Sequence, residues 1–446
     1  MPQILFPLVV FYSFQFFFSS KMFYFLSFFI LAFFLWRATR NLTKSLSYTL
    51  VLALFSEVGL AGSLFVMEPR SLNPDIGWWI SPISLIVLCL LPLSLANRLV
   101  KKIKTVDLLV AAFLIWNSLM IVFYPFSQNV LYSVIGLTEL TIAYFLLRIN
   151  LSKEDLGPAV YLIISALLFQ SFLGGLQATY GRNVGSVVEP VNLISPYGLT
   201  TIESDDLFRV TGGSGHANLF AITIVTLMPF LFMLKIMIIP LFIVIPLMLL
   251  LTFSRLAWAI GGILFLSMIV IFKKKQIIKL KYLLAFSLPF ILLLPLVSLR
   301  ISSFGQAFSS GGSWDMRYKV WQEAFGLLKQ YPLIGIGQNR FQQLAQEQRT
   351  SYVFRSPTLS PATKIHNIFL EIATETGLIG LTVFAVFIIF LFNLLRVAFK
   401  KNENREMINT LLLSLVGLLM MSQFHPLFHT AQFRLYYLLA VLIAVV

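Results

Sequence analysis

Apolar stretches of about 20 residues recur from one end of this 446-residue chain to the other, and a helix of that length crosses a hydrocarbon core of roughly 30 Å. Charged residues make up 11% of the chain, whereas soluble domains carry about 25%. Hydrophobic residues make up 58%. The sequence therefore predicts an all-α polytopic membrane protein, folded as a single transmembrane domain over residues 1–446.

The apolar stretches predict where the helices lie. Two neighbouring pairs, around Lys21 and Ser254, are joined by almost no polar sequence, so we expect 12 to 14 transmembrane helices. No basic region precedes the first stretch, so a cleavable signal is not expected. The predicted spans lie near 3–19, 22–37, 46–66, 78–97, 106–124, 129–149, 158–177, 216–234, 236–253, 255–272, 282–299, 377–396, 407–424 and 431–446.

Basic residues between the spans predict the orientation. Four clusters fall on one side of the membrane, which the positive-inside rule makes cytoplasmic together with both termini. They contain Arg37, Arg40 and Lys44; Lys101, Lys102 and Lys104; Lys273, Lys274, Lys275, Lys279 and Lys281; and Arg396, Lys400, Lys401 and Arg405. These loops account for the net charge of +15 without a nucleic-acid partner. The single cysteine, Cys89, lies within a predicted span and excludes an intrachain disulfide.

Two segments are then expected to face outward, 180–215 and 300–376, and the second carries His366. Within the second, apolar residues between 316 and 330 fall on one helical face, and Pro332 and Gly335 end the pattern. Two interpretations stay open: an amphipathic helix lying on the membrane surface, or a helix packed on the spans. Both place Arg317 in its first turn.

The first outward segment ends in a glycine-rich stretch that contains Gly212, Gly213 and Gly215. Successive amides in such a stretch can form an anion-binding concavity. The alternative is simple turn geometry, because no strand and no nucleotide fingerprint accompanies the glycines.

Arginines gather at the predicted outer face, where membrane proteins normally avoid them. Arg255 stands between two apolar stretches, and an arginine within a span costs at least about 2.5 kcal/mol. It therefore either snorkels to the interface or faces an anion. Guanidinium groups match phosphate with a planar fork of donors, so a phosphate-bearing lipid is the predicted ligand. The group comprises Arg209, Arg255, Arg300, Arg317, Arg340 and also His366.

Other polar residues suggest alternatives. Glu57 and Glu139 lie within predicted spans, where carboxylates serve as proton relays in transporters or as neutral packing residues. His425 and His429 have the i, i+4 spacing of a metal pair, but Pro426 disfavours a regular helix and no third ligand lies nearby in sequence. We therefore expect no metal site and no cofactor.

The most specific motif is His366-Asn367, nine residues, then Gly377-Leu378-Ile379-Gly380. It resembles the signature of the O-antigen ligase and O-antigen polymerase family at every fixed position. Weaker similarity extends over about 209–380, although Ala217 stands where the family commonly has proline. The resembling positions are Arg209, Thr211, Gly212, His216 and Asn218; Ser254 and Arg255; and Arg317, Trp321, Pro332, Gly335, Gly337 and Phe341.

The resemblance implies a GT-C-like, metal-independent, inverting glycosyltransferase of the bacterial cytoplasmic membrane, active at its outer face. The donor would be a glycan on undecaprenyl diphosphate, and the acceptor hydroxyl would belong to lipid A-core, another repeat unit or a protein Ser or Thr. His366, Arg317 and Arg255 would be catalytic. Substrate-binding residues would be Arg209, Gly212, His216, Asn218, Asn367, Gly377 and Gly380. The rival function is a solute transporter, resembling proposed bicarbonate transporters, that uses Glu57 and Glu139.

Overall fold

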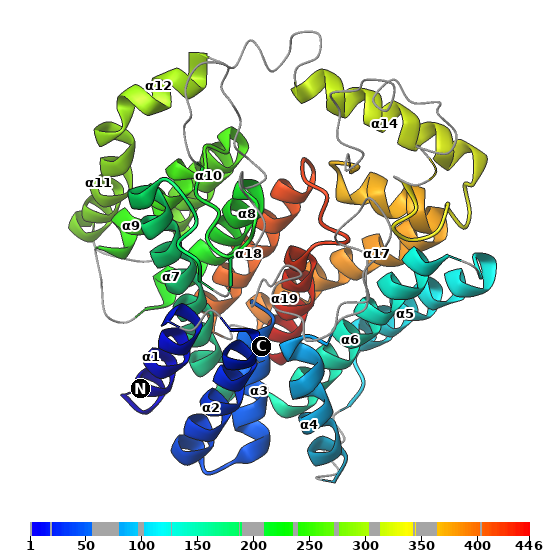
Figure 1. The fold of residues 1–446 in the computed structure, drawn as a ribbon, viewed down its shortest axis with the longest axis horizontal. Coiled ribbons are helices and arrows are strands. Elements are labelled where there is room, and N and C mark those ends of the chain that lie inside the picture. Colours follow the sequence, from blue (N-terminus) through cyan, green and yellow to red (C-terminus); the bar gives the residue numbers. More distant parts are fainter. Residues whose placement is uncertain are drawn as a thin grey trace.

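The computed structural model describes most of the chain. The described residues are 2–17, 20–55, 80–96, 102–125, 127–186, 188–189, 209–234, 240–271, 276–302, 313–341, 344, 364–401 and 404–446. All regular elements within these ranges are helices, which confirms the all-α polytopic class (Figure 1).

Each of the fourteen predicted spans overlaps a helix of the described chain. The helices are α1 Pro2–Phe17, α2 Lys21–Thr39, α3 Leu42–Ala53, α4 Pro82–Ala96, α5 Thr105–Phe123, α6 Gln128–Asn150, α7 Leu156–Tyr180, α8 Ala217–Leu227, α9 Leu241–Leu251, α10 Arg255–Ile271, α11 Gln276–Leu292, α12 Leu294–Ser302, α14 Ser313–Gln330, α17 Ile368–Lys400, α18 Arg405–Ser422 and α19 Arg434–Val445. Short 3₁₀ turns cover η2 Lys153–Asp155, η3 Met228–Met233 and η4 Ala431–Phe433.

Six of the described helices are long and apolar enough to cross a membrane alone, and six shorter apolar helices accompany them. The expected count of 12 to 14 crossings stays a prediction. The span predicted near 282–299 is not one straight helix, because α11 and α12 meet at a bend of 73°. Pro295 follows the break at Leu293: its missing N–H is tolerated in the first turn of a new helix but removes a bond from a continuous one.

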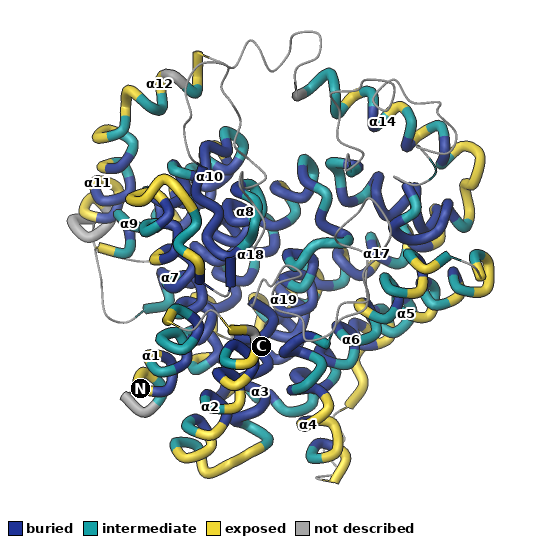
Figure 2. The backbone as a smooth tube through the Cα atoms, viewed as in Figure 1, coloured by how far each residue is buried: buried dark blue, intermediate teal, exposed yellow. Residues whose placement is uncertain are grey.

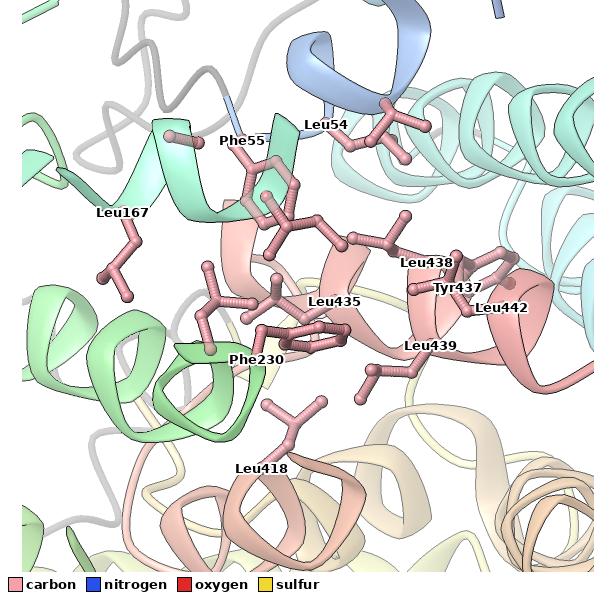
Figure 3. Packing of buried hydrophobic residues seen from close by; sticks show 14 of the residues in the cluster. Leu54, Phe55, Leu167, Phe230, Leu418, Leu435, Tyr437, Leu438, Leu439 and Leu442 are labelled. Atoms are coloured by element: carbon pink, nitrogen blue, oxygen red, sulfur yellow. The ribbon is translucent and has the colours of Figure 1, made fainter. Parts of the chain in front are cut away.

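The core surrounds α19, in which every residue from Leu435 to Val445 is buried. Figure 3 shows Leu435, Leu438 and Leu442 of α19 among Leu167 of α7, Phe230 of η3 and Leu418 of α18. Figure 2 colours the whole backbone by burial and shows that the buried segments lie in the middle and the exposed ones at the rim. Close packing of this kind is what holds helices together where lipid tails compete for apolar contacts.

Charged contacts tie together one end of the helix bundle. They are Lys44 Nζ to Asp155 Oδ1 at 2.7 Å, Arg148 Nε to Asp107 Oδ1 at 3.6 Å, and Lys104 Nζ to the Ala444 carbonyl at 2.5 Å. The α2–α3 connection, the start of α5, the α6–α7 connection and the C-terminus therefore lie together. Two of the basic clusters share this end, as predicted; that it faces the cytoplasm stays a prediction.

The α5–α6 connection lies at the other end of α5 and α6 and contacts the segment after α14. Tyr124 Oη donates to the Gly335 carbonyl at 2.6 Å, and Asn129 Nδ2 donates to the Asn339 carbonyl at 3.2 Å. The described part of the second outward segment is thus opposite the clustered basic residues. In Figure 1, α12 and α14 lie at the edge of the molecule opposite α2 and α3.

Helix α14 contains the sequence near 316–330, and whether its exposed side lies on a membrane surface stays a prediction. Its buried face packs on the start of α17 and the neighbouring loops, whereas Tyr318 and Phe325 on its other side are 59% and 52% exposed. The amphipathic helix is therefore packed on the protein, and Gln330 is its last residue. The buried contact comprises Val320, Ala324, Leu327, Ile336, Phe341, Ile365 and Leu370.

Candidate active site

The turn between α9 and α10 gathers arginines. Arg209 Nε donates to the Thr252 carbonyl at 2.8 Å, and Arg300 Nε donates to the Phe253 carbonyl at 3.2 Å. Phe253 has a φ of 51°, a left-handed conformation that ends α9, and Arg255 begins α10 two residues later. Carbonyl groups at the C-terminal end of a helix attract cations. This turn therefore holds Arg209 and Arg300 beside Arg255.

Arg317 reaches the same place from α14. Burial lowers the pKa of Arg317, and the charge of Arg255 lowers it further. Burial also lowers the pKa of Arg209 to about 9, with contributions from Arg300 and Arg255. The structure thus brings together Arg209, Arg255, Arg300 and Arg317 from four separate parts of the chain. The sequence placed Arg340 in the same group, but the structure does not.

Arg340 lies apart from these arginines. Its guanidinium stacks on the Tyr124 ring at 4.6 Å from the centroid, and its Nη1 donates to the Ile336 carbonyl at 3.1 Å. These contacts tie the segment after α14 to the α5–α6 connection. Its inclusion among the ligand-binding arginines is therefore not supported by the geometry.

His366 has the tautomer of a general base. Its Nδ1 lies 2.7 Å from the Lys364 carbonyl, which can only accept, so Nδ1 carries the proton and Nε2 keeps its lone pair. Burial and the nearby charge of Arg317 lower the pKa of His366 to about 4, opposed by the Lys364 carbonyl. The imidazole is therefore neutral near pH 7 in the ligand-free protein.

Asn367, the second residue of the motif, is a helix cap. Its Oδ1 accepts from the Leu370 amide at 3.0 Å and begins α17. Its Nδ2 donates to the Gln423 carbonyl at 3.2 Å, across to the loop after α18. Both contacts are with protein, so the observed role of Asn367 is to fix the backbone next to His366.

His216 and Asn218 extend the arginine cluster. Asn218 Oδ1 accepts from Arg209 Nη2 at 2.9 Å. The Asn218 amide donates to His216 Nδ1 at 3.1 Å, so His216 caps the start of α8. Burial lowers the pKa of His216 to about 3, and Arg209 and His366 add to the effect. The structure therefore places both residues beside Arg209 and within electrostatic reach of His366.

The glycine-rich stretch is a turn closed by glutamine side chains. The Gly212 amide donates to Gln177 Oε1 at 3.0 Å, and the Gly213 amide donates to Gln170 Oε1 at 2.5 Å. Gly212 has a φ of 55°, which explains the glycine. Because these two amides already have acceptors, the contacts favour the turn interpretation over the anion-binding one.

Gly377 breaks α17 into two helices. Its φ is 71°, and a side chain there would overlap the Leu333 carbonyl. The Leu378 amide donates to the Pro332 carbonyl at 2.8 Å, and the Gly337 amide donates to the Glu375 carbonyl at 2.9 Å. The segment after α14 is therefore bonded to the break, which orients the short helix that His366 precedes.

Gly380 allows a second close approach. A side chain at this position would overlap Thr376 and crowd Trp116 of α5. Trp116 Nε1 also donates to the Thr376 carbonyl at 2.8 Å. Gly377 and Gly380 face protein in the structure, and their assignment to substrate binding stays a prediction.

Sequence reasoning missed Glu371 and Glu375 on the short helix between His366 and Gly377. Glu371 Oε2 accepts from the Phe428 amide at 3.1 Å, and Glu375 Oε2 lies 2.5 Å from His429 Nε2. The available signal was two carboxylates at i, i+4 within an apolar helix, which need partners. His429 is thus a partner for Glu375, and within the described ranges no group of three potential metal ligands is found.

Glu139 is hydrogen-bonded to two serines at the start of α4, Ser81 just before the helix and Ser84 in its first turn. Ser81 Oγ donates to Glu139 Oε1 at 2.6 Å, and Ser84 Oγ donates to the same oxygen. These contacts match the packing interpretation of Glu139. Glu57, the other residue of the transporter hypothesis, lies outside the described residues.

The charges that shift the pKa values of Arg209, Arg317 and His366 come from arginines and from Lys364. A concentration of like charge in a partly buried position attracts an anion. Guanidinium forks suit phosphate oxygens, and a neutral imidazole beside them can accept a proton. The arrangement can therefore hold a phosphate-bearing group next to a base.

A family model described as O-antigen ligase matches residues 240–385. The matched stretch contains Arg255, Arg300, Arg317 and the whole histidine–glycine motif, whereas Arg209 precedes it. No curated protein matches the chain. The resemblance predicted from the motif is thus confirmed at the level of the family.

Gly377→Ala tests the break in α17. We expect a destabilisation of about 3 kcal/mol or more, because alanine is strained at positive φ and its methyl group overlaps the Leu333 carbonyl. The measurement is the melting temperature of the purified protein in detergent. Gly136→Ala is the matched control, since a side chain there meets nothing within 4 Å. Equal melting temperatures for both variants would contradict the account.

The His429–Glu375 pair predicts a pH-dependent stability. Burial alone would lower the pKa of His429, but the charge and hydrogen bond of Glu375, with the charge of Glu371, outweigh it and raise the pKa. A raised pKa in the folded state stabilises the protein at low pH, and that contribution is lost as pH rises above the ordinary histidine value of about 6.5.

We therefore expect the melting temperature of the wild type to fall as pH increases above that value, and His429→Gln to weaken this dependence. The other histidines with shifted pKa values are lowered, so they act below about pH 6.5. Burial raises the pKa of Glu371 to about 8, so this carboxyl also contributes above pH 6.5, and the test is the difference between the variant and the wild type. If the melting temperature depended on pH identically in the variant and the wild type, His429 and Glu375 would not form a charged pair.

Proposed function

We propose that this protein, a member of the O-antigen ligase family through the domain at residues 240–385, transfers a glycan from undecaprenyl diphosphate to an acceptor hydroxyl. The family assignment makes it broadly an O-antigen ligase or polymerase type of membrane glycosyltransferase. The reaction takes place at the outer face of the bacterial cytoplasmic membrane. The observation that carries the proposal is the convergence of arginines from separate elements beside the neutral imidazole of His366.

The arginines bind the diphosphate of the donor. Arg255 and Arg317 contact its oxygens and stabilise the negative charge that grows there as the anomeric bond breaks. Arg209 and Arg300, held by carbonyls of the α9–α10 turn, complete the cationic surface. Fixed guanidinium groups supply the charge that a divalent cation supplies in other transferases, so the proposed reaction uses none.

His366 activates the acceptor. The acceptor oxygen attacks the anomeric carbon, its proton moves to Nε2 of His366, and the bond from that carbon to the diphosphate oxygen breaks. Undecaprenyl diphosphate leaves with the bonding electrons. Attack from the side opposite the leaving group inverts the configuration at the anomeric carbon. The hydrogen bond from Nδ1 to the Lys364 carbonyl keeps Nε2 available for this transfer.

The acceptor belongs to one of the classes that the family uses. Lipid A-core, a further glycan repeat unit and a protein Ser or Thr all present a hydroxyl, and each uses the same donor site and base. The rival transporter function gains no support from Glu139, which has serine partners at the start of α4. Transfer of a labelled lipid-linked glycan to each acceptor class, by purified protein in liposomes, identifies the acceptor.

Arg317→Lys tests the clamp. Lysine keeps the charge but loses the planar fork of donors, so we expect the turnover number to fall about 10²- to 10³-fold. The measurement is steady-state transfer from undecaprenyl-diphosphate-linked glycan. Arg396→Lys, the same change at an exposed residue of α17, is the control and should transfer at the wild-type rate. Similar rates in both variants would exclude Arg317 from the site.

His366→Ala tests the base. We expect transfer to fall about 10²- to 10⁴-fold, the usual range for loss of a general base. Binding of undecaprenyl diphosphate should change little, since the arginines remain. A variant that transfers glycan at the wild-type rate would show that His366 takes no proton.

The pH profile tests the environment of His366. The base must be neutral to act, and burial together with Arg317 lowers the pKa of His366 to about 4. We therefore expect kcat/KM to fall only as pH approaches that value, rather than near 6.5. In kcat the acidic limb should lie at higher pH, because the bound diphosphate offsets the arginine charges. A kcat/KM limb near 6.5 would contradict this description of the free site.

A further inference from the structure

The loop between α18 and η4, residues 423–430, lies between His366 and Arg317. At its start, the Gln423 carbonyl accepts from Asn367, the neighbour of His366. The next residue, Phe424, packs its ring edge-on against Trp314, with 5.5 Å between centroids. Trp314 in turn stacks with the guanidinium of Arg317, 5.6 Å from the ring centroid. The loop therefore connects the base to the proposed clamp.

The same loop is fixed from behind by the short helix of α17. The Phe428 amide donates to Glu371, and His429 pairs with Glu375. These contacts lie on the far side of His425 along the chain from Gln423 and Phe424. The backbone on both sides of His425 is thus held by contacts with the catalytic elements.

His425 itself is buried and has an unused polar atom. The residue is 4% exposed, and its Nε2 has no hydrogen-bond partner in the described part of the chain. Buried polar atoms are nearly always paired, so an orphan beside a candidate site indicates a missing ligand. The ionisable groups close enough to influence the pKa of His425 are His366, Arg317, His216 and Arg209, which places it among the site residues.

The surroundings of His425 decide what the ligand atom is. Guanidinium groups only donate hydrogen bonds, so an acceptor atom is the group that fits between them and the imidazole. Burial and the neighbouring cations lower the pKa of His425 well below the ordinary histidine value, which keeps the ring neutral. A neutral ring donates one hydrogen bond without adding a further positive charge to the cluster.

We propose that His425 is a substrate-binding residue whose Nε2–H donates a hydrogen bond to a phosphoryl oxygen of the donor diphosphate. The proposal rests on the proposed function, and it adds a neutral donor to the arginine site. On this proposal, the loop 423–430 contributes a ligand-binding residue to the site that α10, α14 and α17 form.

The test compares His425→Leu and His425→Gln in the full-length protein in nanodiscs. The probes are undecaprenyl diphosphate for binding and undecaprenyl-diphosphate-linked glycan for turnover. Loss of one hydrogen bond to a charged oxygen should weaken lipid binding and raise the donor KM by about ten- to a hundredfold, with kcat changed much less. His425→Gln keeps an N–H donor and should recover part of the affinity.

Inorganic pyrophosphate separates the phosphoryl contact from contacts with the lipid tail. If His425 binds phosphoryl oxygen, pyrophosphate should compete for the wild type and compete less well for His425→Leu by a similar factor. Melting temperatures identify a variant that does not fold, and His425→Gln then decides the outcome.

The outcomes distinguish a failure of the proposed function from a failure of the role of His425. Wild-type protein that binds neither lipid nor pyrophosphate would contradict the proposed function itself. Wild-type binding that His425→Leu leaves unchanged would overturn the role of His425 alone. A fall in kcat with unchanged donor affinity would also overturn it, because His425 would then act on the acceptor and not on the diphosphate.

Discussion

Repulsion between like charges is the constraint on which this site depends. Four partly buried arginines lie close enough that their charges lower one another's pKa. They are Arg209, Arg255, Arg300 and Arg317. Carbonyls of the α9–α10 turn hold two of them in place. Keeping cations together costs free energy, and an anionic ligand recovers it. The cluster is therefore understandable as a receptor for a diphosphate, which also explains why the base beside it stays neutral.

The histidine–glycine motif corresponds to one short helix with a fixed start and a fixed end. Asn367 begins the short helix after His366, and Gly377 ends it with a left-handed residue that only glycine adopts without strain. The segment after α14 is hydrogen-bonded to that break, so α14, with Arg317, and the base share one support. The nine-residue spacing is the length of this short helix, and it sets the position of the imidazole relative to the guanidinium of Arg317.

Much of this was predictable from sequence, because apolar stretches and the spacing of the motif are local signals. The helices, the grouping of Arg209, Arg255, Arg300 and Arg317, and the choice of His366 follow from them. The sequence did not predict Gln170 and Gln177 under the glycine turn, the pairing of Glu375 with His429, or His425, since each depends on contacts between distant segments. The α11–α12 bend was also missed, although Pro295 was visible, because apolar composition alone does not report a break in a helix.

The most direct test of the central claim is a structure of the protein bound to undecaprenyl diphosphate in a lipid bilayer. The account predicts density for the diphosphate in contact with Arg255 and Arg317, with Nε2 of His366 facing the position of the attacking hydroxyl. Diphosphate bound at the end of the bundle where Lys44 meets Asp155, or anywhere away from these arginines, would contradict it.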